Sequence, residues 1–315
     1  MNRKIKVGVA GVGSLGSIHA RIYHELENSD FVGVYDSASE QAESVARKYG
    51  VMAFNSLDEL ADAVEAVSVV VPTDKHREVA GRLIERGRHV LIEKPIASTT
   101  EEAEELVALA TANHVIVQVG HVERFNPVMS YLEKAAQNPR FIEAHRLAPY
   151  PPPRDGLKPR GTEVSVILDL MIHDLEVILY LVNSPVRNIH AVGVPVLSPT
   201  EDIANVRLAF ENGCVANVTS SRISPERMRK IRVFLDEAYI SLDYQNQSGE
   251  IYKKDGAGIG REEVPIEREE PLVRELRAFV DCVGRRDEPV VSGEHASAAL
   301  HLAVDIIHRL REGAS

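Results

Sequence analysis

The sequence contains no tryptophan, only two cysteines and no long apolar run. Cys214 and Cys282 lie far apart and match no metal-binding or redox pattern. No stretch approaches the roughly 18 apolar residues of a membrane-spanning helix. The apolar run at the start is too short, and too soon interrupted by glycine, for a signal peptide. We therefore expect a protein of the reducing cytoplasm, with no membrane partner and no bound metal.

Basic residues are also in deficit. The 36 lysines and arginines stand against 47 aspartates and glutamates, which gives a net charge of −11. Such a chain is repelled by nucleic acid, so we expect no nucleic-acid partner. Apolar residues make up 44% and charged residues 26%, which excludes disordered and collagen-like chains. At about 150 residues per domain, the length predicts two domains.

Short apolar runs rich in valine and isoleucine alternate with amphipathic segments over the first 120 residues. The pattern predicts strands buried on both faces, joined by helices into a parallel, doubly wound sheet. Ser56–Glu59 and Ser98–Glu101 match the capping box that begins a helix. The predicted strands are Ile5–Ala10, Phe31–Tyr35, Val51–Phe54, Val67–Val71, His89–Ile92 and Val115–Val119.

The rhythm changes near residue 122, which we take as the boundary between two domains, 1–122 and 123–315. Asn126 and Pro127 are typical of a helix start, and a proline-rich stretch later precedes an apolar helix predicted over Glu163–Val182. Strand-like runs then follow without long helices between them, which favours an antiparallel sheet. These strands are Ile189–Val196, Ile203–Phe210, Val215–Ser221, Ile231–Leu235 and Tyr239–Leu242, and the closing helices are Leu272–Val283 and Glu294–Arg311.

A glycine-rich loop follows the first predicted strand and opens a helix. Gly11 suits the tight turn, Gly13 lets a pyrophosphate approach the backbone, and Gly16 lets helix and strand pack closely. Asp36 ends the second strand, where a carboxylate binds ribose hydroxyls and repels a 2′-phosphate. The order of these features favours an NAD site over a glycine turn with a solvated aspartate. The predicted cofactor-binding residues of the loop are Gly11, Gly13, Ser14, Leu15 and Gly16.

Three further segments follow predicted parallel strands, where open α/β sheets bind ligands: Val71–His76, Glu93–Pro95 and Gly120–Pro127. Lys94 precedes a proline, which favours an extended backbone. An ammonium group at this place stabilises a developing alkoxide or helps to move its proton. A solvated lysine at a strand end is the alternative.

The apolar helix carries Asp169 and His173, which lie four residues apart and share one helix face. Polar groups in so apolar a segment need partners or a function. A neutral imidazole accepts a proton near pH 7, as the oxidation of an alcohol requires. A histidine held by the aspartate for packing is the alternative, and the residues alone leave both open.

In chain order, the motifs are GVGSLG with Asp36, VVPTDKH, EKP, GHVERFNP and DLMIHD. This series resembles the Gfo/Idh/MocA family of NAD(P)-dependent oxidoreductases over nearly the whole chain, and PLVRELRAF with PVVSG near the end resembles its C-terminal region. The resemblance implies an α/β protein: a Rossmann domain with a parallel sheet, 1–122, and a substrate-binding and oligomerisation α/β domain, 123–315. The second domain would contain a large, open, mostly antiparallel sheet. It also implies NAD as cofactor and a homo-oligomer, a dimer or a tetramer.

The same resemblance assigns roles to individual residues. Lys94 matches the catalytic lysine, His173 the acid/base, and Asp169 belongs to the same motif. The implied cofactor-lining residues outside the glycine loop are Asp36, Pro72, Thr73, His76, Glu93 and Lys94. The predicted substrate-binding residues are Lys94, Arg124, Asn126, Asp169 and His173, and the charge pattern described below adds Arg154 and Arg160.

One position departs from the family pattern, because Met171 stands where many members have a glycine that leaves room beside the substrate. DLMIHD and GHVERFNP are most similar to the subgroup of UDP-N-acetylglucosamine 3-dehydrogenases, which oxidise the sugar C3 hydroxyl to a ketone for later amination. Two alternatives remain: an inositol or simple sugar dehydrogenase, and a catalytically idle NAD-binding regulator. Retention of both Lys94 and His173 favours an enzyme.

Two basic segments bear on a nucleotide-sugar substrate. The first holds Arg140, Arg146, Arg154, Lys158 and Arg160, and the second holds Arg222, Arg227, Arg229, Lys230 and Arg232. Arginine suits phosphate because its fork binds two oxygens at once. Our hypothesis is that Arg154, Lys158 or Arg160 reaches the substrate diphosphate. The alternative is that these side chains solvate the surface or pair with acids across a subunit interface.

Overall fold

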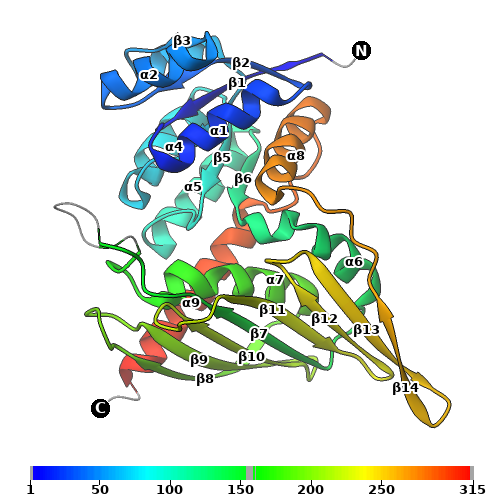
Figure 1. The fold of residues 1–315 in the computed structure, drawn as a ribbon. Helices are drawn as coiled ribbons and strands as arrows, with labels where there is room; N and C mark the ends of the chain where they lie inside the picture. Colours follow the sequence, from blue (N-terminus) through cyan, green and yellow to red (C-terminus); the bar gives the residue numbers. More distant parts are fainter. Residues whose placement is uncertain (1–2, 154–158, 160, 313–315) are drawn as a thin grey trace. The chain divides into compact units, whose positions relative to one another are not determined.

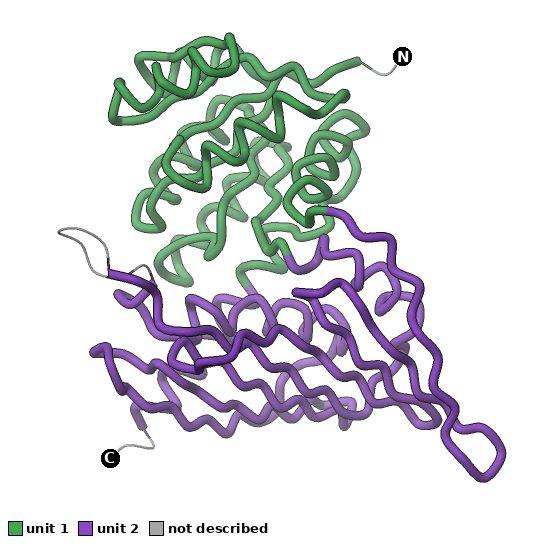
Figure 2. Tube along the Cα trace, in the orientation of Figure 1, with its two compact units in different colours: residues 1–122, 270–297 green, residues 123–269, 298–315 purple. Residues whose placement is uncertain are grey.

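The computed structural model describes residues 3–153, 159 and 161–312. The chain forms two compact units (Figure 2). The first comprises Met1–Val122 and Glu270–Ser297, and the second comprises Glu123–Glu269 and Ala298–Ser315. Each unit mixes helices with a sheet, and the predicted α/β class is confirmed.

The sheet of the first unit is parallel and six-stranded, in the order β3-β2-β1-β4-β5-β6 (Figure 1). Its strands are β1 Ile5–Ala10, β2 Ser29–Tyr35, β3 Met52–Ala53, β4 Ala66–Val69, β5 His89–Glu93 and β6 Val117–Gly120. All six predicted strands are present, β1 with the predicted bounds and the other five with shifted ends. The chain reverses its winding direction between β1 and β4, so the loops after these strands meet at the ligand-binding edge of a Rossmann sheet.

The helices of this unit are α1 Ser14–Glu25, α2 Ser39–Tyr49, α3 Leu57–Ala63, α4 His76–Glu85, α5 Thr100–Asn113 and α8 Pro271–Arg285. Ser56 caps α3, as predicted, because its side chain accepts from the Glu59 amide. The second capping box is displaced by one residue, since Thr99 accepts from the Glu102 amide. The STTEE run contains both spacings, and the prediction took the wrong one.

The single boundary expected after residue 122 does not describe the C-terminal part of the chain. Residues 270–297 return to the first unit, where Leu276, Phe279 and Val283 of α8 join the core formed around β1 and α1. The sequence pattern shows that α8 has an apolar face, but it does not show which sheet that face covers.

The second unit contains an eight-stranded sheet in the order β14-β13-β12-β11-β7-β10-β9-β8 (Figure 1). All its pairs are antiparallel except β7 with β10. Its strands are β7 Phe141–Leu147, β8 Val186–Val194, β9 Ile203–Phe210, β10 Val215–Ser221, β11 Met228–Phe234, β12 Ala238–Asp243, β13 Ser248–Asp255 and β14 Gly258–Glu263. We did not predict β13 and β14, because these strands at one edge are rich in charge and glycine and lack an apolar run.

The helices of the second unit are α6 Pro127–Ala135, α7 Ile172–Val182 and the later part of α9 Gly293–Glu312. Asn126 caps α6, as its sequence predicts. The apolar helix begins later than expected. A π-helical turn spans Ile167–Met171, and regular α-helix follows from Ile172. No helix among the residues described here combines the length and apolarity that crossing a bilayer requires.

The loop between β1 and α1 depends on two glycines. Gly11 has a φ of 88°, which favours glycine, and a Cβ at Gly16 would overlap the Gly11 carbonyl oxygen. Gly13 differs, because no atom outside its chain neighbours lies within 4 Å of a Cβ placed there.

We therefore expect Gly16→Ala to lower the free energy of unfolding by about 3 kcal/mol, since the helix must move away from the strand. Gly13→Ala is the matched control and should cost less than about 1 kcal/mol. Urea denaturation followed by circular dichroism measures both. Equal losses in the two variants would contradict this account of the loop.

Candidate functional site

The glycine loop and Asp36 form one hydrogen-bonded group. The Asp36 carboxylate accepts from the Val12 amide at 2.7 Å and from the Ala38 amide at 2.9 Å. Gln41, which the sequence analysis did not single out, donates to the Val12 carbonyl at 2.8 Å. Gly13 and Ser14 are exposed at the start of α1. A helix N-terminus beside an open glycine, with a half-buried carboxylate at the next strand end, fits the pyrophosphate and ribose of NAD.

His76 joins the loops that follow β4 and β5. The residue is 1% exposed, and its ring places Nδ1 2.9 Å from the Pro95 carbonyl oxygen and Nε2 3.0 Å from that of Val71. Burial lowers the pKa of His76, and a neutral ring donates to only one of the two carbonyls. The side chain therefore holds the two loops together from inside. The cofactor contact expected of His76 stays a prediction, whereas Pro72 is exposed and Thr73 half-buried.

Lys94 is half-buried in the turn after β5, and its peptide bond to Pro95 is cis. Its backbone amide donates to the Glu93 carboxylate at 3.3 Å. On the other side, His19 Nε2 of α1 lies 3.2 Å from Glu93 Oε1. Gly120 leaves room for this carboxylate, because a Cβ there would lie 3.0–3.1 Å from its atoms. Glu93 thus supports the lysine turn internally, and its predicted contact with the cofactor remains untested.

Glu275 of α8 is a second buried carboxyl near this turn. Burial, followed by the negative charge of Glu93, raises the pKa of Glu275 well above its usual range and favours its neutral form. The sequence analysis missed both His19 and Glu275. Each is a polar residue on the inward, apolar face of its helix, and that position was the available signal.

In the second unit, Asp169 lies in the π-helical turn and His173 in the first turn of α7. Both side chains are half-buried, whereas the neighbouring Met171 is 0% exposed. Met171 therefore belongs to the core of the second unit. Gly161 has a φ of 81° and lies against Asp169, since a Cβ there would be 2.8 Å from Asp169 Cγ.

A buried ion-pair network lies behind His173. Arg146 binds Asp174 through two hydrogen bonds, from Nε at 2.8 Å and Nη2 at 3.0 Å, and donates to Glu123 Oε1 from Nη1 at 2.8 Å. Burial raises the pKa of Asp174, although Arg146 opposes the shift. The network joins β7, α7 and the turn before α6, and so fixes the base of the helix that carries His173.

Arg124 and Asn126 also point inward. Arg124 donates to Glu176 Oε1 at 2.7 Å, and its guanidinium lies 3.3 Å from the centre of the Tyr180 ring. Burial raises the pKa of Glu176 to about 7, even beside this arginine. Asn126 donates to the Tyr244 carbonyl at 3.1 Å. Both side chains are almost fully buried, so this geometry does not support the direct substrate contact expected of them.

Most described residues of the two basic segments form ion pairs with acidic residues of the same chain. Arg154, Lys158 and Arg160, the residues proposed for the diphosphate, lie outside the described residues. Among the described residues of the two segments, the ion pairs are Arg140–Asp236, Arg146–Asp174, Arg222–Asp202, Arg229–Glu123, Lys230–Asp243 and Arg232–Glu143. These pairs lie within the chain, and the predicted contact of Arg154, Lys158 or Arg160 with a diphosphate stays a prediction.

Comparison with known proteins supplies the family. Residues 5–121 match the model of an oxidoreductase family with an NAD-binding Rossmann fold, and residues 134–241 match the GFO/IDH/MocA C-terminal domain. The chain is 35% identical over 309 residues to a UDP-N-acetylglucosamine 3-dehydrogenase of Acidithiobacillus ferrooxidans, with 96% of each chain covered. It is 26% identical to a myo-inositol 2-dehydrogenase of Thermotoga maritima, with 95% of this chain and 94% of the relative covered.

Solved structures agree with these matches. A structure of the Acidithiobacillus ferrooxidans enzyme is similar with a TM-score of 0.91 and 34% identity, and 98% of each chain is covered. The two family models and this similarity along nearly the whole length lead to one conclusion. The chain belongs to the Gfo/Idh/MocA family of oxidoreductases, with NAD as its cofactor.

Proposed function

We propose that this protein is an NAD-dependent dehydrogenase that oxidises the C3 hydroxyl of UDP-N-acetylglucosamine to a ketone. The observation that carries the substrate is the 35% identity to an enzyme of that name, which extends over 96% of both chains. The presence of Lys94, Asp169 and His173 in half-buried positions supports a catalytic rather than a regulatory protein.

Different residues of the chain bind the cofactor, accept the proton and stabilise the developing charge. The glycine loop and Asp36 hold NAD, which supplies the hydride acceptor when bound. His173 accepts the proton of the sugar hydroxyl, and Asp169, one helical turn earlier, orients the substrate or the imidazole. The Lys94 ammonium stabilises the negative charge that develops on the hydroxyl oxygen. The alcohol thereby loses a proton and a hydride, and becomes a ketone.

The first experiment measures NADH formation by purified protein with NAD and a panel of substrates. The panel holds UDP-N-acetylglucosamine, its uronic acid, UDP-glucose, myo-inositol and glucose, with hydroxylamine present to trap a ketone. Turnover of UDP-N-acetylglucosamine alone is the expected result. Turnover of a free polyol instead would replace this substrate with the inositol alternative, and intact NAD binding without turnover would favour a regulator.

The catalytic assignment predicts that His173→Ala and Lys94→Ala each lower kcat at least 100-fold, because proton transfer and oxyanion stabilisation each contribute about that much. The NAD affinity of His173→Ala, measured by calorimetry, should change less than about threefold, a difference under 1 kcal/mol, because His173 is not among the residues expected to line the cofactor. His190→Ala is the control, since this histidine is exposed on β8. Near-normal turnover in either catalytic variant would remove that residue from the mechanism.

The diphosphate hypothesis predicts that replacing Arg154 and Arg160 together by alanine raises the KM for UDP-N-acetylglucosamine about tenfold or more, with a smaller effect on kcat. Arg140→Ala is a suitable control, because Arg140 belongs to the same basic segment but pairs with Asp236 at 3.1 Å. An unchanged KM in the double variant would end the hypothesis.

We also propose that the protein is a cytoplasmic homo-oligomer that uses the outer face of the eight-stranded sheet. Half-buried rings cross that face. Phe234 stacks on Tyr239 and Tyr239 on Tyr252, with centroid distances of 5.2 and 4.3 Å, and Phe141 lies tilted against Phe234 at 5.4 Å. Partly buried aromatic side chains are enriched in interfaces. Light scattering after gel filtration should give a multiple of 34.7 kDa. A mass of one chain would contradict the proposal.

A further inference from the structure

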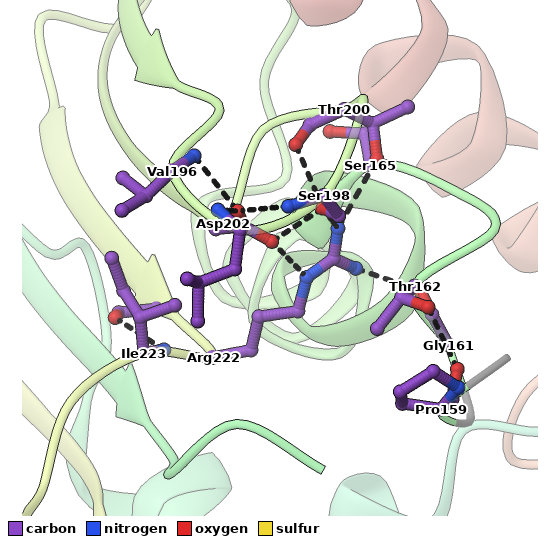
Figure 3. A network of polar contacts seen from close by, with 12 residues as sticks. Pro159, Gly161, Thr162, Ser165, Val196, Ser198, Thr200, Asp202, Arg222 and Ile223 are labelled. Atoms are coloured by element: carbon purple, nitrogen blue, oxygen red, sulfur yellow. Dashed lines mark hydrogen bonds and ion pairs between the residues drawn. The ribbon is translucent and has the colours of Figure 1, made fainter. Parts of the chain in front are cut away.

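Arg222 uses its whole guanidinium group inside the protein (Figure 3). It follows β10 directly and is 2% exposed. Arginine has five N–H donors in a planar fork. Its bonds run from Nε to Asp202 Oδ1 at 2.8 Å, from Nη1 to the carbonyls of Gly161 at 2.7 Å and Val164 at 2.8 Å, and from Nη2 to Ser198 Oγ at 2.8 Å and Thr200 Oγ1 at 3.1 Å. Every donor therefore has an acceptor.

One group of these acceptors belongs to the loop between β8 and β9. Asp202 organises that loop, because its Oδ2 accepts from the amides of Val196, Leu197 and Ser198 at 2.8, 2.6 and 2.9 Å. Burial tends to raise the pKa of Asp202, but hydrogen bonds from Ser198, Arg222 and the loop amides lower it below its usual range. Arg222 thus meets a carboxylate that is already held in place.

The other group belongs to the segment that leads into the candidate catalytic helix. Besides its bond to Arg222, the Val164 carbonyl accepts from Thr200 Oγ1 at 2.9 Å. The Val166 amide donates to the Glu201 carbonyl at 2.9 Å. Residues 161–166 are therefore attached to the β8–β9 loop at several points, as Figure 3 shows for Gly161 and Arg222.

The attachment is close to the proposed chemistry. Gly161, whose carbonyl Arg222 binds, lies directly against the Asp169 carboxylate. Any shift of Gly161 therefore changes the space that Asp169 occupies. The same segment continues through the π-helical turn into α7, where His173 lies one turn after Asp169.

We propose that Arg222 is a positioning residue, which holds segment 161–166 so that Asp169 and His173 are oriented for proton transfer. The inference rests on the function proposed above. A buried ion pair is seldom required for stability alone, since apolar residues of similar volume often replace one without loss. The fork of an arginine, unlike a lysine ammonium, can bind a carboxylate, two carbonyls and two hydroxyls in fixed directions.

The test compares Arg222→Lys with Arg222→Ala, and uses Arg232→Ala as the matched control. Arg232 comes from the same basic segment but is half exposed and pairs with Glu143 at 3.5 Å. We expect both Arg222 variants to lower kcat about 10- to 100-fold, because small displacements of catalytic groups have effects of this size. The dissociation constant of NAD, which binds the first unit, should stay within about twofold, a difference under 0.5 kcal/mol. If Arg222 only stabilised the fold, the folded fraction of each variant would have both a normal kcat and a normal dissociation constant of NAD.

A milder variant covers the case in which the Arg222 variants do not fold. Thr200→Val removes the hydroxyl that donates to the Val164 carbonyl and accepts from Arg222, and it keeps the other four hydrogen bonds of Arg222. We expect kcat to fall several-fold in this variant. Unchanged kcat in a folded Arg222 variant would overturn the proposal. If the Arg222 variants do not fold, unchanged kcat in Thr200→Val would overturn it.

Hydrogen exchange separates this inference from the proposed function. Faster amide exchange confined to residues 161–174 is expected in Arg222→Lys and Thr200→Val, whether or not the wild-type protein turns over the tested sugars. Wild-type protein without dehydrogenase activity, combined with that exchange pattern, would reject the proposed function and keep Arg222 as the anchor of the segment. Unchanged exchange there, or faster exchange throughout the second unit, would reject the anchor itself.

Discussion

Burial of charge is the constraint on which the second unit depends. A charged side chain inside a protein loses its hydration, and only an opposite charge and hydrogen bonds replace it. Arg146 meets this requirement with Asp174, and Arg222 meets it with Asp202. Each pair joins segments that are distant in sequence, and both act on the region around α7. The arginines of an acidic chain thus organise the interior of the unit that carries His173.

The first unit depends on the close packing of helix α1 against the loop that follows β1. Gly16 lets α1 lie against the turn at Gly11, and this brings the inward face of α1 to the sheet. His19 on that face reaches Glu93, whose carboxylate also receives the amide of Lys94. His76 holds the neighbouring loops from the other direction. The helix α1, whose N-terminus we expect to bind the cofactor, therefore also supports the lysine turn.

Local patterns predicted the fold well wherever the signal was periodic. The strands of the parallel sheet are apolar because both faces are covered, and all six were found. Prediction failed for β13 and β14, whose charged residues lie at an exposed edge. It also placed α8 in the wrong unit. An amphipathic pattern predicts that one face of a helix is buried, but it does not indicate which sheet that face packs against.

The sequence by itself determined the apolar strands, the amphipathic helices, the glycine loop with Asp36, and the family, since each depends on residue types at short, regular spacing. Tertiary structure alone decided which polar residues lie inside. Arg124 and Asn126 have the composition of a binding segment, yet both are buried among internal partners. Arg222 belongs to a basic segment of the sequence, and the folded chain encloses it with five acceptors. Charge is a property of the residue, whereas pairing depends on contacts between segments that only folding brings together.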